Sequence, residues 1–232
     1  MSSPVVFPNL VRVRVGMAPR SQPFDESMAS LHAAMMYAHQ HGFHVVLQKI
    51  QGGVPGFQNY GPVIVDFLRE GDTHLVVAGD DTIWPLDSIV RLVEHDVDVV
   101  SGIYRKNDIS GLAPACHTEN AGDFREKFDS ATIHPTPFAS AHSMTIKRRV
   151  IEKMIADYPE LNYRVGNDTH TGIFIPMIED GIAYQDDWAF SVRARRSGFT
   201  LYDDYGCRLK HFCSGFLGFE ALEQAVEEFA HA

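Results

Sequence analysis

Short apolar segments alternate with helical segments over the first hundred residues, and this alternation constrains the fold more than any other feature. Residues 9–17 alternate apolar and polar side chains, as a strand with one buried face does. The predicted strands are residues 9–17, 43–50, 75–78 and 96–101, and the predicted helices begin at Asp25, at about Tyr60 and at Pro85. Strands that alternate with helices imply a largely parallel sheet with right-handed crossovers.

The second half of the chain has a less regular pattern. Residues 107–137 contain several prolines and glycines, so we expect loops and short antiparallel strands there, and residues 158–180 also read as loop. The other predicted elements are strands 138–146, 199–202 and 208–212, helices 147–157 and 187–197, and a C-terminal helix from about Phe219. The sequence therefore predicts a single α/β domain over residues 1–232, with a mostly parallel central sheet flanked by helices and a short antiparallel portion in its second half.

Composition narrows the class of protein. The net charge of −10 disfavours broad contact with nucleic acid or anionic lipid, although it does not exclude a nucleic-acid acceptor. No apolar stretch approaches the roughly 20 residues that span a bilayer, and the N-terminus lacks the pattern of a signal peptide. Three cysteines without a CxxC pair argue against a disulfide framework. We expect a cytoplasmic protein without a membrane span.

Two adjacent carboxylates, Asp80 and Asp81, follow the apolar strand 75–78 directly. A strand that ends in acids presents them at the carboxyl edge of the sheet, where open α/β folds bind ligands. Two such close carboxylates repel each other unless a cation or hydrogen-bond donors lie between them. Oxygen ligands favour Mg²⁺ or Mn²⁺, which commonly hold substrate phosphates. The structural alternative is a solvated turn in which an Asp caps the next helix.

Three further segments follow in a fixed order. They are Ser101-Gly102-Ile103-Tyr104 at the end of a strand, Asp186-Asp187-Trp188-Ala189-Phe190 at the start of a helix, and Arg208-Leu209-Lys210-His211 at the end of a late strand. Together with the acidic strand end, this order and spacing resemble those of GT-A glycosyltransferases, especially the small family 2-like members. The resemblance covers about residues 9–212. It implies a nucleotide-binding half over about 9–106, an acceptor half over about 107–215, and transfer of a sugar from a nucleoside-diphosphate sugar to a hydroxyl group.

In the family that this chain resembles, the last acid of an Asp-x-Asp element binds the divalent metal, Mn²⁺ or Mg²⁺. Its position before Trp84-Pro85 matches Asp81, whereas Gly79 stands where the first Asp is expected. This departure concerns nucleotide affinity and metal dependence. Asp80 is a candidate to substitute for the missing carboxylate in donor binding, although a strand neighbour of Asp81 points to the other face. His211 matches a further metal ligand; its alternative is a hydrogen-bonded core histidine.

The resemblance also implies a catalytic base. Asp187 matches the acid that takes the proton from the acceptor hydroxyl in inverting transfer, and Asp186 replaces the Glu that precedes it. A helix N-terminus stabilises a carboxylate and tends to lower its pKa. The structural alternative for the pair is an N-cap followed by a first-turn acid.

Donor contacts are expected from two loops. By resemblance, Pro19 and Arg20 follow the first strand and contact the nucleotide, as does Asn59, whose alternative is a helix N-cap. Arg105 is a candidate to assist the departing diphosphate, or is an exposed loop cation. His142 could contact the acceptor or could be structural.

Two other functions stay open at this point. A sugar-phosphate nucleotidyltransferase would share the fold and the metal chemistry, although only one glycine occurs in Gly16-Met17-Ala18-Pro19-Arg20. A non-catalytic nucleotide-sugar-binding module could tolerate Gly79. The donor base (UDP or GDP), the sugar, the acceptor and the oligomeric state are not determined by the sequence.

Overall fold

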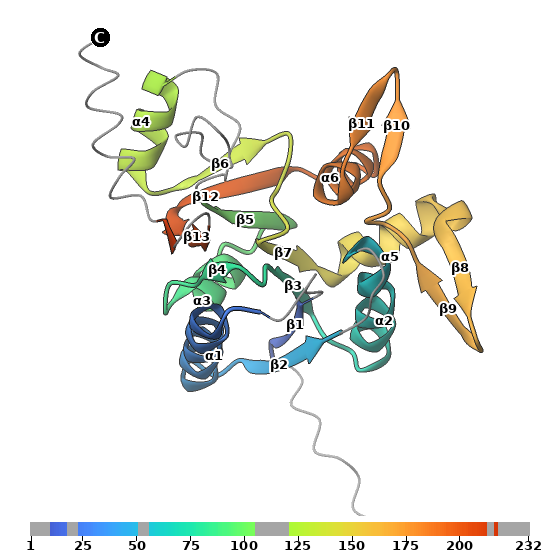
Figure 1. The fold of residues 1–232 in the computed structure, drawn as a ribbon, viewed down its shortest axis with the longest axis horizontal. Helices are drawn as coiled ribbons and strands as arrows, with labels where there is room; N and C mark the ends of the chain where they lie inside the picture. Colours follow the sequence, from blue (N-terminus) through green and yellow to red (C-terminus); the bar gives the residue numbers. More distant parts are fainter. Residues whose placement is uncertain (1–9, 18–22, 51–55, 105–120, 213–215, 218–232) are drawn as a thin grey trace, which may run out of the picture.

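A seven-stranded sheet forms the centre of the molecule (Figure 1). The structure is a computed structural model that describes residues 10–17, 23–50, 56–104, 121–212 and 216–217. In spatial order the strands are β2 (His44–Lys49), β1 (Arg12–Met17), β3 (His74–Ala78), β7 (Ser143–Lys147), β5 (Val99–Ile103), β12 (Leu201–Arg208) and β6 (Ile133–Thr136). Five of the seven run in one direction, while β7 and β6 are antiparallel to their neighbours. This confirms the predicted fold class.

Helices cover both faces of the sheet. The first face packs against α1 (Asp25–Gln40) and α3 (Ser88–Glu94), and the second against α2 (Gly56–Arg69), α5 (Arg148–Asp157) and α6 (Asp186–Arg196) (Figure 1). Alternate side chains of β3 point to opposite faces of the sheet. Val76 and Ala78 pack in the hydrophobic core on the first face, and Leu75 and Val77 pack in the core on the second face. A strand buried on both faces needs the continuous apolar run that this segment has.

Several expected loops are regular structure instead. The segments 107–137 and 158–180 contain α4 (Ala121–Ser130), the 3₁₀ turn η1 (Pro159–Leu161), and the hairpins β8 (Asn162–Val165)–β9 (Asp168–Thr171) and β10 (Met177–Glu179)–β11 (Ile182–Tyr184). The expectation of loops was wrong for these elements, whereas the short antiparallel strand expected within 107–137 is present as β6, which pairs antiparallel with β12. Asp180 and Gly181 both have positive φ, 50° and 77°, which is typical of the tight turn that Asp-Gly favours in hairpins.

Other element boundaries shift. The helix expected at Pro85 begins at Ser88, after a turn in which the Ser88 N–H donates to the Pro85 carbonyl at 3.2 Å, and a short strand, β4 (Thr82–Ile83), precedes that turn. The helix expected at about Tyr60 begins at Gly56, and β12 is one strand through residues 201–208. Two short strands, β13 (Lys210–Phe212) and β14 (Phe216–Leu217), form a separate three-stranded sheet with β4. The helix predicted from Phe219 lies outside the described residues.

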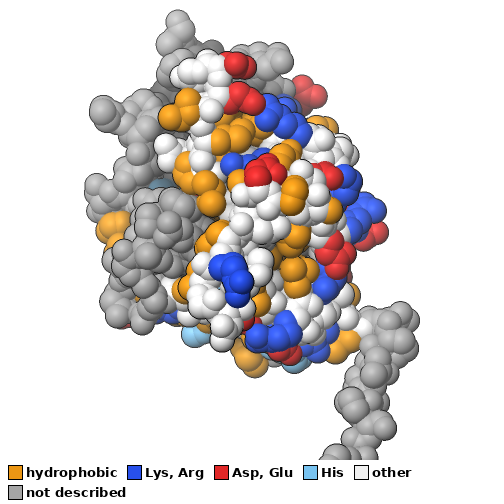
Figure 2. Space-filling view, turned by 90° about the vertical axis from the view of Figure 1, so that its right-hand side faces the viewer, with side chains coloured by type: hydrophobic (Ala, Val, Ile, Leu, Met, Phe, Trp, Pro, Cys, Tyr) orange, Lys and Arg blue, Asp and Glu red, His pale blue; other side chains and the backbone are white. Residues whose placement is uncertain are grey.

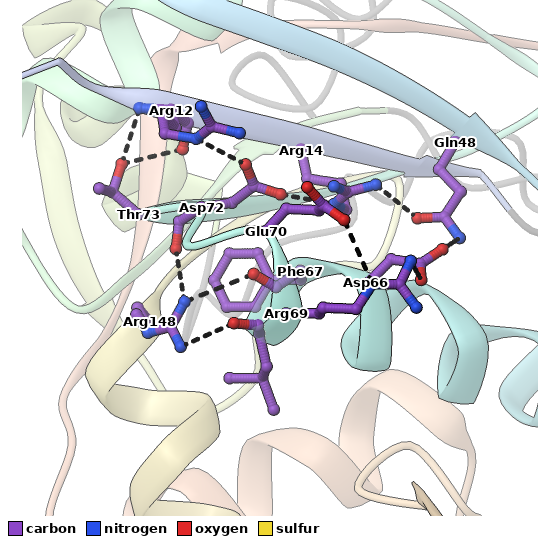
Figure 3. Close-up of polar contacts among 11 residues, drawn as sticks. Arg12, Arg14, Gln48, Asp66, Phe67, Arg69, Glu70, Asp72, Thr73 and Arg148 are labelled. Atoms are coloured by element: carbon purple, nitrogen blue, oxygen red, sulfur yellow. Dashed lines mark hydrogen bonds and ion pairs between the residues drawn. The ribbon is translucent and has the colours of Figure 1, made fainter. Parts of the chain in front are cut away.

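A polar network joins the segments at the amino end of β3 (Figure 3). Asp72 is fully buried and pairs with Arg14 at 2.6 Å and with Arg12 at 3.3 Å, both from β1. The first residue of α5, Arg148, donates hydrogen bonds to the Phe67 and Leu68 carbonyls in the last turn of α2. Cations near a helix C-terminus satisfy its unpaired carbonyls. This network fixes α2 and α5 relative to the sheet.

The side of the molecule that carries α2, α5 and the two hairpins has mixed surface chemistry. Basic, acidic and hydrophobic side chains are interspersed over the described part of this face (Figure 2). Val165, Ile178 and Ile182 are exposed on the hairpins.

Among the described residues, no helix is both long enough and apolar enough to cross a bilayer.

A second ion pair is buried between α3 and β12. Both carboxylate oxygens of Asp204, which is inaccessible to solvent, accept hydrogen bonds from Arg91, at 2.5 and 2.8 Å. His95 lies 2.7 Å from the same carboxylate, and the Gly206 N–H donates to it at 2.8 Å. Burial would raise the pKa of Asp204, but these hydrogen bonds outweigh it and lower the pKa to about 2.

This pair should make stability depend on acid pH. The folded-state pKa lies below the unfolded value, so the stabilisation is complete above about pH 4 and is lost as the pH falls through about 2. Urea unfolding of the wild-type protein and of Asp204→Asn, between pH 5 and pH 2, measures the effect. We expect the difference between their unfolding free energies to shrink by roughly 2 kcal/mol over that range. A difference that stays constant with pH would contradict this assignment.

Candidate active site

Asp81 is positioned by a small sheet beyond the end of β3. The next two residues form β4, which pairs antiparallel with β13 so that Thr82 faces His211. The Phe212 N–H donates to the Asp81 carbonyl at 2.9 Å. As a result, His211 Nε2 lies 3.3 Å from Asp81 Oδ2, and the His211 side chain is largely buried.

His142 approaches Asp81 from the other side. It lies in the turn 139–142, directly before β7, and β7 pairs with β3 so that Ser143 faces Ala78. The Gly79 N–H donates to the His142 carbonyl at 3.1 Å. This pairing places His142 Nε2 3.4 Å from Asp81 Oδ1. The structure thus brings together one carboxylate and two imidazoles.

Tyr104 and Ser140 support the two imidazole rings. The centroid of the Tyr104 ring lies 4.2 Å from that of His142 and 5.0 Å from that of His211. Ser140 Oγ lies 3.3 Å from His142 Nδ1, on the opposite side of the ring from Nε2. Burial raises the pKa of Tyr104, so that its phenol stays neutral. These contacts orient both imidazoles toward Asp81.

The electrostatics of Asp81 fit a cation site. Burial would raise its pKa, but the neighbouring imidazoles of His142 and His211 outweigh burial and lower the pKa well below its usual range. Asp81 Oδ1 is buried and makes no hydrogen bond to any residue that the structure describes. Its 3.4 Å separation from His142 Nε2 exceeds the usual length of such a bond. The carboxylate is therefore charged and one of its oxygens lacks a donor.

The three side chains also fit a divalent metal ion by their spacing. One ligand atom from each of Asp81, His142 and His211 can be chosen so that all lie within 4.8 Å of one another. Metal–ligand distances of about 2.0–2.2 Å put neighbouring ligand atoms about 3 Å apart on an ion. The separations of 3.3 and 3.4 Å are close to that value. One oxygen and two nitrogen donors suit Mn²⁺ and similar ions.

Asp186 and Asp187 form the first turn of α6. Asp186 Oδ1 accepts the Asp187 N–H at 3.0 Å, and Asp187 Oδ1 accepts the Trp188 N–H at 2.9 Å. Asp187 Oδ2 faces the Ala141 N–H at 3.4 Å. A second hydrogen bond joins the turn 139–142 to α6, because the Ala139 N–H donates to Ser191 Oγ at 3.1 Å.

The pKa of Asp187 is raised, contrary to the sequence-based expectation. Burial is the main cause and repulsion by Asp186 is the second; together they outweigh the backbone hydrogen bonds from Ala141 and Trp188. The helix N-terminus alone would have lowered the pKa. A carboxylate with a raised pKa is a stronger base than an ordinary surface aspartate.

Asp81, His142 and the acids Asp186 and Asp187 line one pocket at the carboxyl edge of the parallel strands. The pocket has a volume of about 280 Å³ and is lined by Tyr60, Ala78, Gly79, Asp80, Asp81, Ala141, His142, Gln185, Asp186 and Asp187. The end of β3, the turn before β7 and the start of α6 form most of its wall. This is the edge at which open α/β sheets bind ligands.

Four of the residues predicted from sequence do not have described side chains. Asn59 lies within α2, but its side chain is outside the described part of the structure, as are Pro19, Arg20 and Arg105. Their contact with a nucleotide stays a prediction. His142 was not predicted as a ligand. The available signal was Gly79, which stands where the resemblance implies a carboxylate.

Comparison with known proteins bears on the fold. A scan against protein-family models found no match, and a search of curated proteins found none. Among solved structures, GalNAc-T7 with UDP, GalNAc and Mn²⁺ aligns with a TM-score of 0.53 and 10% identity over 96% of this chain and 48% of that chain. The fold is GT-A-like.

Other structures align less closely with this GT-A-like chain. The catalytic domain of Drosophila β1,4-galactosyltransferase 7, in complex with xylobiose, has a TM-score of 0.44 and 11% identity over 84% of this chain and 65% of that chain. A nucleoside-diphosphate-sugar pyrophosphorylase from Vibrio cholerae has a TM-score of 0.44 and 10% identity over 93% of this chain and 99% of that chain. The chain spans about half the length of the GalNAc-T7 chain and under two thirds of the galactosyltransferase chain. At such identities the likeness concerns the fold alone.

Proposed function

We propose that the protein is a metal-dependent glycosyltransferase. It moves a sugar from a nucleoside-diphosphate sugar, linked to UDP or GDP, onto a hydroxyl acceptor with inversion at the anomeric carbon. The observation that carries the proposal is that Asp81, in a cluster suited to a metal ion, and Asp187, a half-buried acid with a raised pKa, line the same pocket. A metal–diphosphate site and a general base are the two parts that this reaction needs.

The proposed chemistry is a single displacement. Asp187 accepts the proton of the acceptor hydroxyl while that oxygen forms a bond to the anomeric carbon, and the bond from this carbon to the diphosphate oxygen breaks with its electron pair. Asp186 keeps the pKa of Asp187 raised by charge repulsion. When bound at Asp81 and His211, Mn²⁺ or Mg²⁺ would neutralise charge on the leaving diphosphate.

Donor contacts complete the proposal. Asp80 lines the pocket beside Asp81, which supports contact with the donor. Pro19, Arg20, Asn59 and Arg105 are proposed to contact the nucleotide or its phosphates. The acceptor is a hydroxyl compound whose class is not specified by these residues.

Calorimetric titration with UDP, GDP and their sugars, with and without Mn²⁺, tests the proposal. We expect donor binding that requires the metal, together with slow hydrolysis of the bound donor. Consumption of a nucleoside triphosphate with release of pyrophosphate would instead identify a nucleotidyltransferase. Donor binding with neither hydrolysis nor transfer, across a panel of glycoside and polyol acceptors, would identify a binding module.

Replacing Asp186 tests its effect on the base. In Asp186→Asn the repulsion is removed, so the pKa of Asp187 should fall. The ionised base then persists to lower pH, and the acidic limb of the pH dependence of kcat/KM moves to lower pH. Donor hydrolysis or transfer measured across the acidic range gives the profile. A limb that stays in place, or moves to higher pH, contradicts this role for Asp186.

A further inference from the structure

We propose that His142 is a metal ligand that takes the place of the carboxylate missing at position 79. The ion would then be held by one carboxylate and two imidazoles, from Asp81, His142 and His211. The role of this ion in sugar transfer rests on the proposed function, whereas its binding does not. Three observations carry the inference: the space around Gly79, the orientation of His142, and the donor set.

Gly79 and His142 compete for the same space. A Cβ atom built on Gly79 would lie 2.8 Å from His142 Cδ2, closer than such atoms approach in proteins, and 3.3 Å from Thr82 Oγ1. The His142 imidazole therefore occupies the space that a first motif Asp would need.

The His142 ring is held in an orientation suitable for a ligand. Its Nε2 faces Asp81 Oδ1 at 3.4 Å, the buried oxygen that accepts no hydrogen bond from the described part of the chain. Its Nδ1 faces Ser140 Oγ, and its ring packs against Tyr104. Histidine ligands are commonly fixed in this way, by a hydrogen bond from the second ring nitrogen to a neighbouring oxygen.

The donor set predicts which ions bind. Imidazole suits Mn²⁺, Fe²⁺, Co²⁺ and Zn²⁺, whereas Mg²⁺ prefers oxygen ligands, so the site should select transition metals over Mg²⁺. A divalent ion held by one carboxylate also keeps a net positive charge, which two carboxylates would cancel. That charge favours the binding of an anionic diphosphate.

The first experiment measures metal binding without turnover. Mn²⁺ and Co²⁺ are titrated by calorimetry, and the visible absorption of Co²⁺ reports nitrogen coordination, in the wild-type protein, in His142→Ala and in the control His32→Ala. His32 is exposed on α1. We expect His142→Ala to bind both ions about 10- to 100-fold more weakly with a changed Co²⁺ spectrum, and the control to match the wild type. Wild-type affinity and spectrum in His142→Ala would overturn the inference.

A swap of the two positions gives the sharper test. Gly79→Asp alone should weaken Mn²⁺ binding, because the new side chain collides with His142. Gly79→Asp combined with His142→Ala should restore binding and shift the Mn²⁺ to Mg²⁺ affinity ratio toward Mg²⁺ by about tenfold or more. Thermal unfolding shows whether each variant folds. If the double variant folds but binds Mn²⁺ no better than Gly79→Asp does, then His142 does not take the place of a carboxylate at position 79.

The same experiments separate this inference from the proposed function. If His142→Ala binds metal as the wild type does while the wild type transfers sugar, the inference fails and the transferase proposal stands. If the metal depends on His142 but no donor is hydrolysed or transferred, the transferase proposal fails and the metal site stands.

Discussion

An Asp81→Asn variant is expected to lose metal-dependent donor binding. Asparagine keeps the shape of the side chain but removes its negative charge, the only one among the three proposed ligands. We expect Mn²⁺ affinity to fall by at least about 100-fold, since changes in the supporting shell of a metal site alone cost 10- to 100-fold. Calorimetric titration of Mn²⁺, and then of UDP and GDP in its presence, measures the loss. Asp81→Ala should behave in the same way.

A matched variant controls for the loss of one negative charge. Asp168→Asn removes a carboxylate from the exposed β8–β9 hairpin, away from the pocket lining. Its Mn²⁺ affinity and donor binding should equal those of the wild type. Metal-dependent donor binding that survives unchanged in Asp81→Asn would exclude Asp81 as the main ligand.

Asp187→Asn is expected to spare donor binding and to lower kcat by a factor of about 10² or more. The amide cannot accept the proton of the acceptor hydroxyl, while the side chain keeps its size at the start of α6. Donor affinity should persist because it depends on the metal cluster at Asp81. Donor titration and single-turnover transfer, or donor hydrolysis where the acceptor is unknown, separate binding from chemistry.

The pH profile strengthens this test. A base acts only when ionised, so wild-type kcat/KM should rise with pH through the raised pKa of Asp187 and then level off. Asp187→Asn should lack that rise. Asp129→Asn on α4, an exposed acid paired with Arg125, serves as the control and should keep both the rate and the profile. Full activity in Asp187→Asn would mean that another group removes the proton.

The fold was predictable where one pattern dominates. The apolar run before Asp80 predicted β3, and the glycines after α1 and α6 predicted where these helices end. The structure has these elements at the expected places. Helix α4 was missed because its segment is rich in charged residues and lies in a region, 107–137, that contains Pro114, Pro135 and Pro137. The β10–β11 hairpin was missed although Asp180-Gly181 is a strong turn signal, since each of its strands has only three residues.

The site was predictable in part for a different reason. Asp81 and Asp187 lie at element boundaries, where the chain pattern itself marks a strand end and a helix start. His211 was predicted as a ligand through the resemblance alone, and its approach to Asp81 depends on the pairing of β13 with β4. His142 depends on the antiparallel insertion of β7 beside β3. Such pairings join segments far apart in sequence, and no local periodicity encodes them. The raised pKa of Asp187 likewise depends on burial, which the helix start alone does not specify.

The side chains of Asp81, His142 and His211 belong to distant stretches of the chain, one before the middle, one after it and one near the end of the described residues. An ion shared among them would act as a reversible cross-link that the unfolded chain cannot maintain. By mass action, a ligand at a hundred times its dissociation constant stabilises the folded state by about 2.7 kcal/mol. Metal supply would then determine how long each molecule survives unfolding and proteolysis, as well as whether it can work.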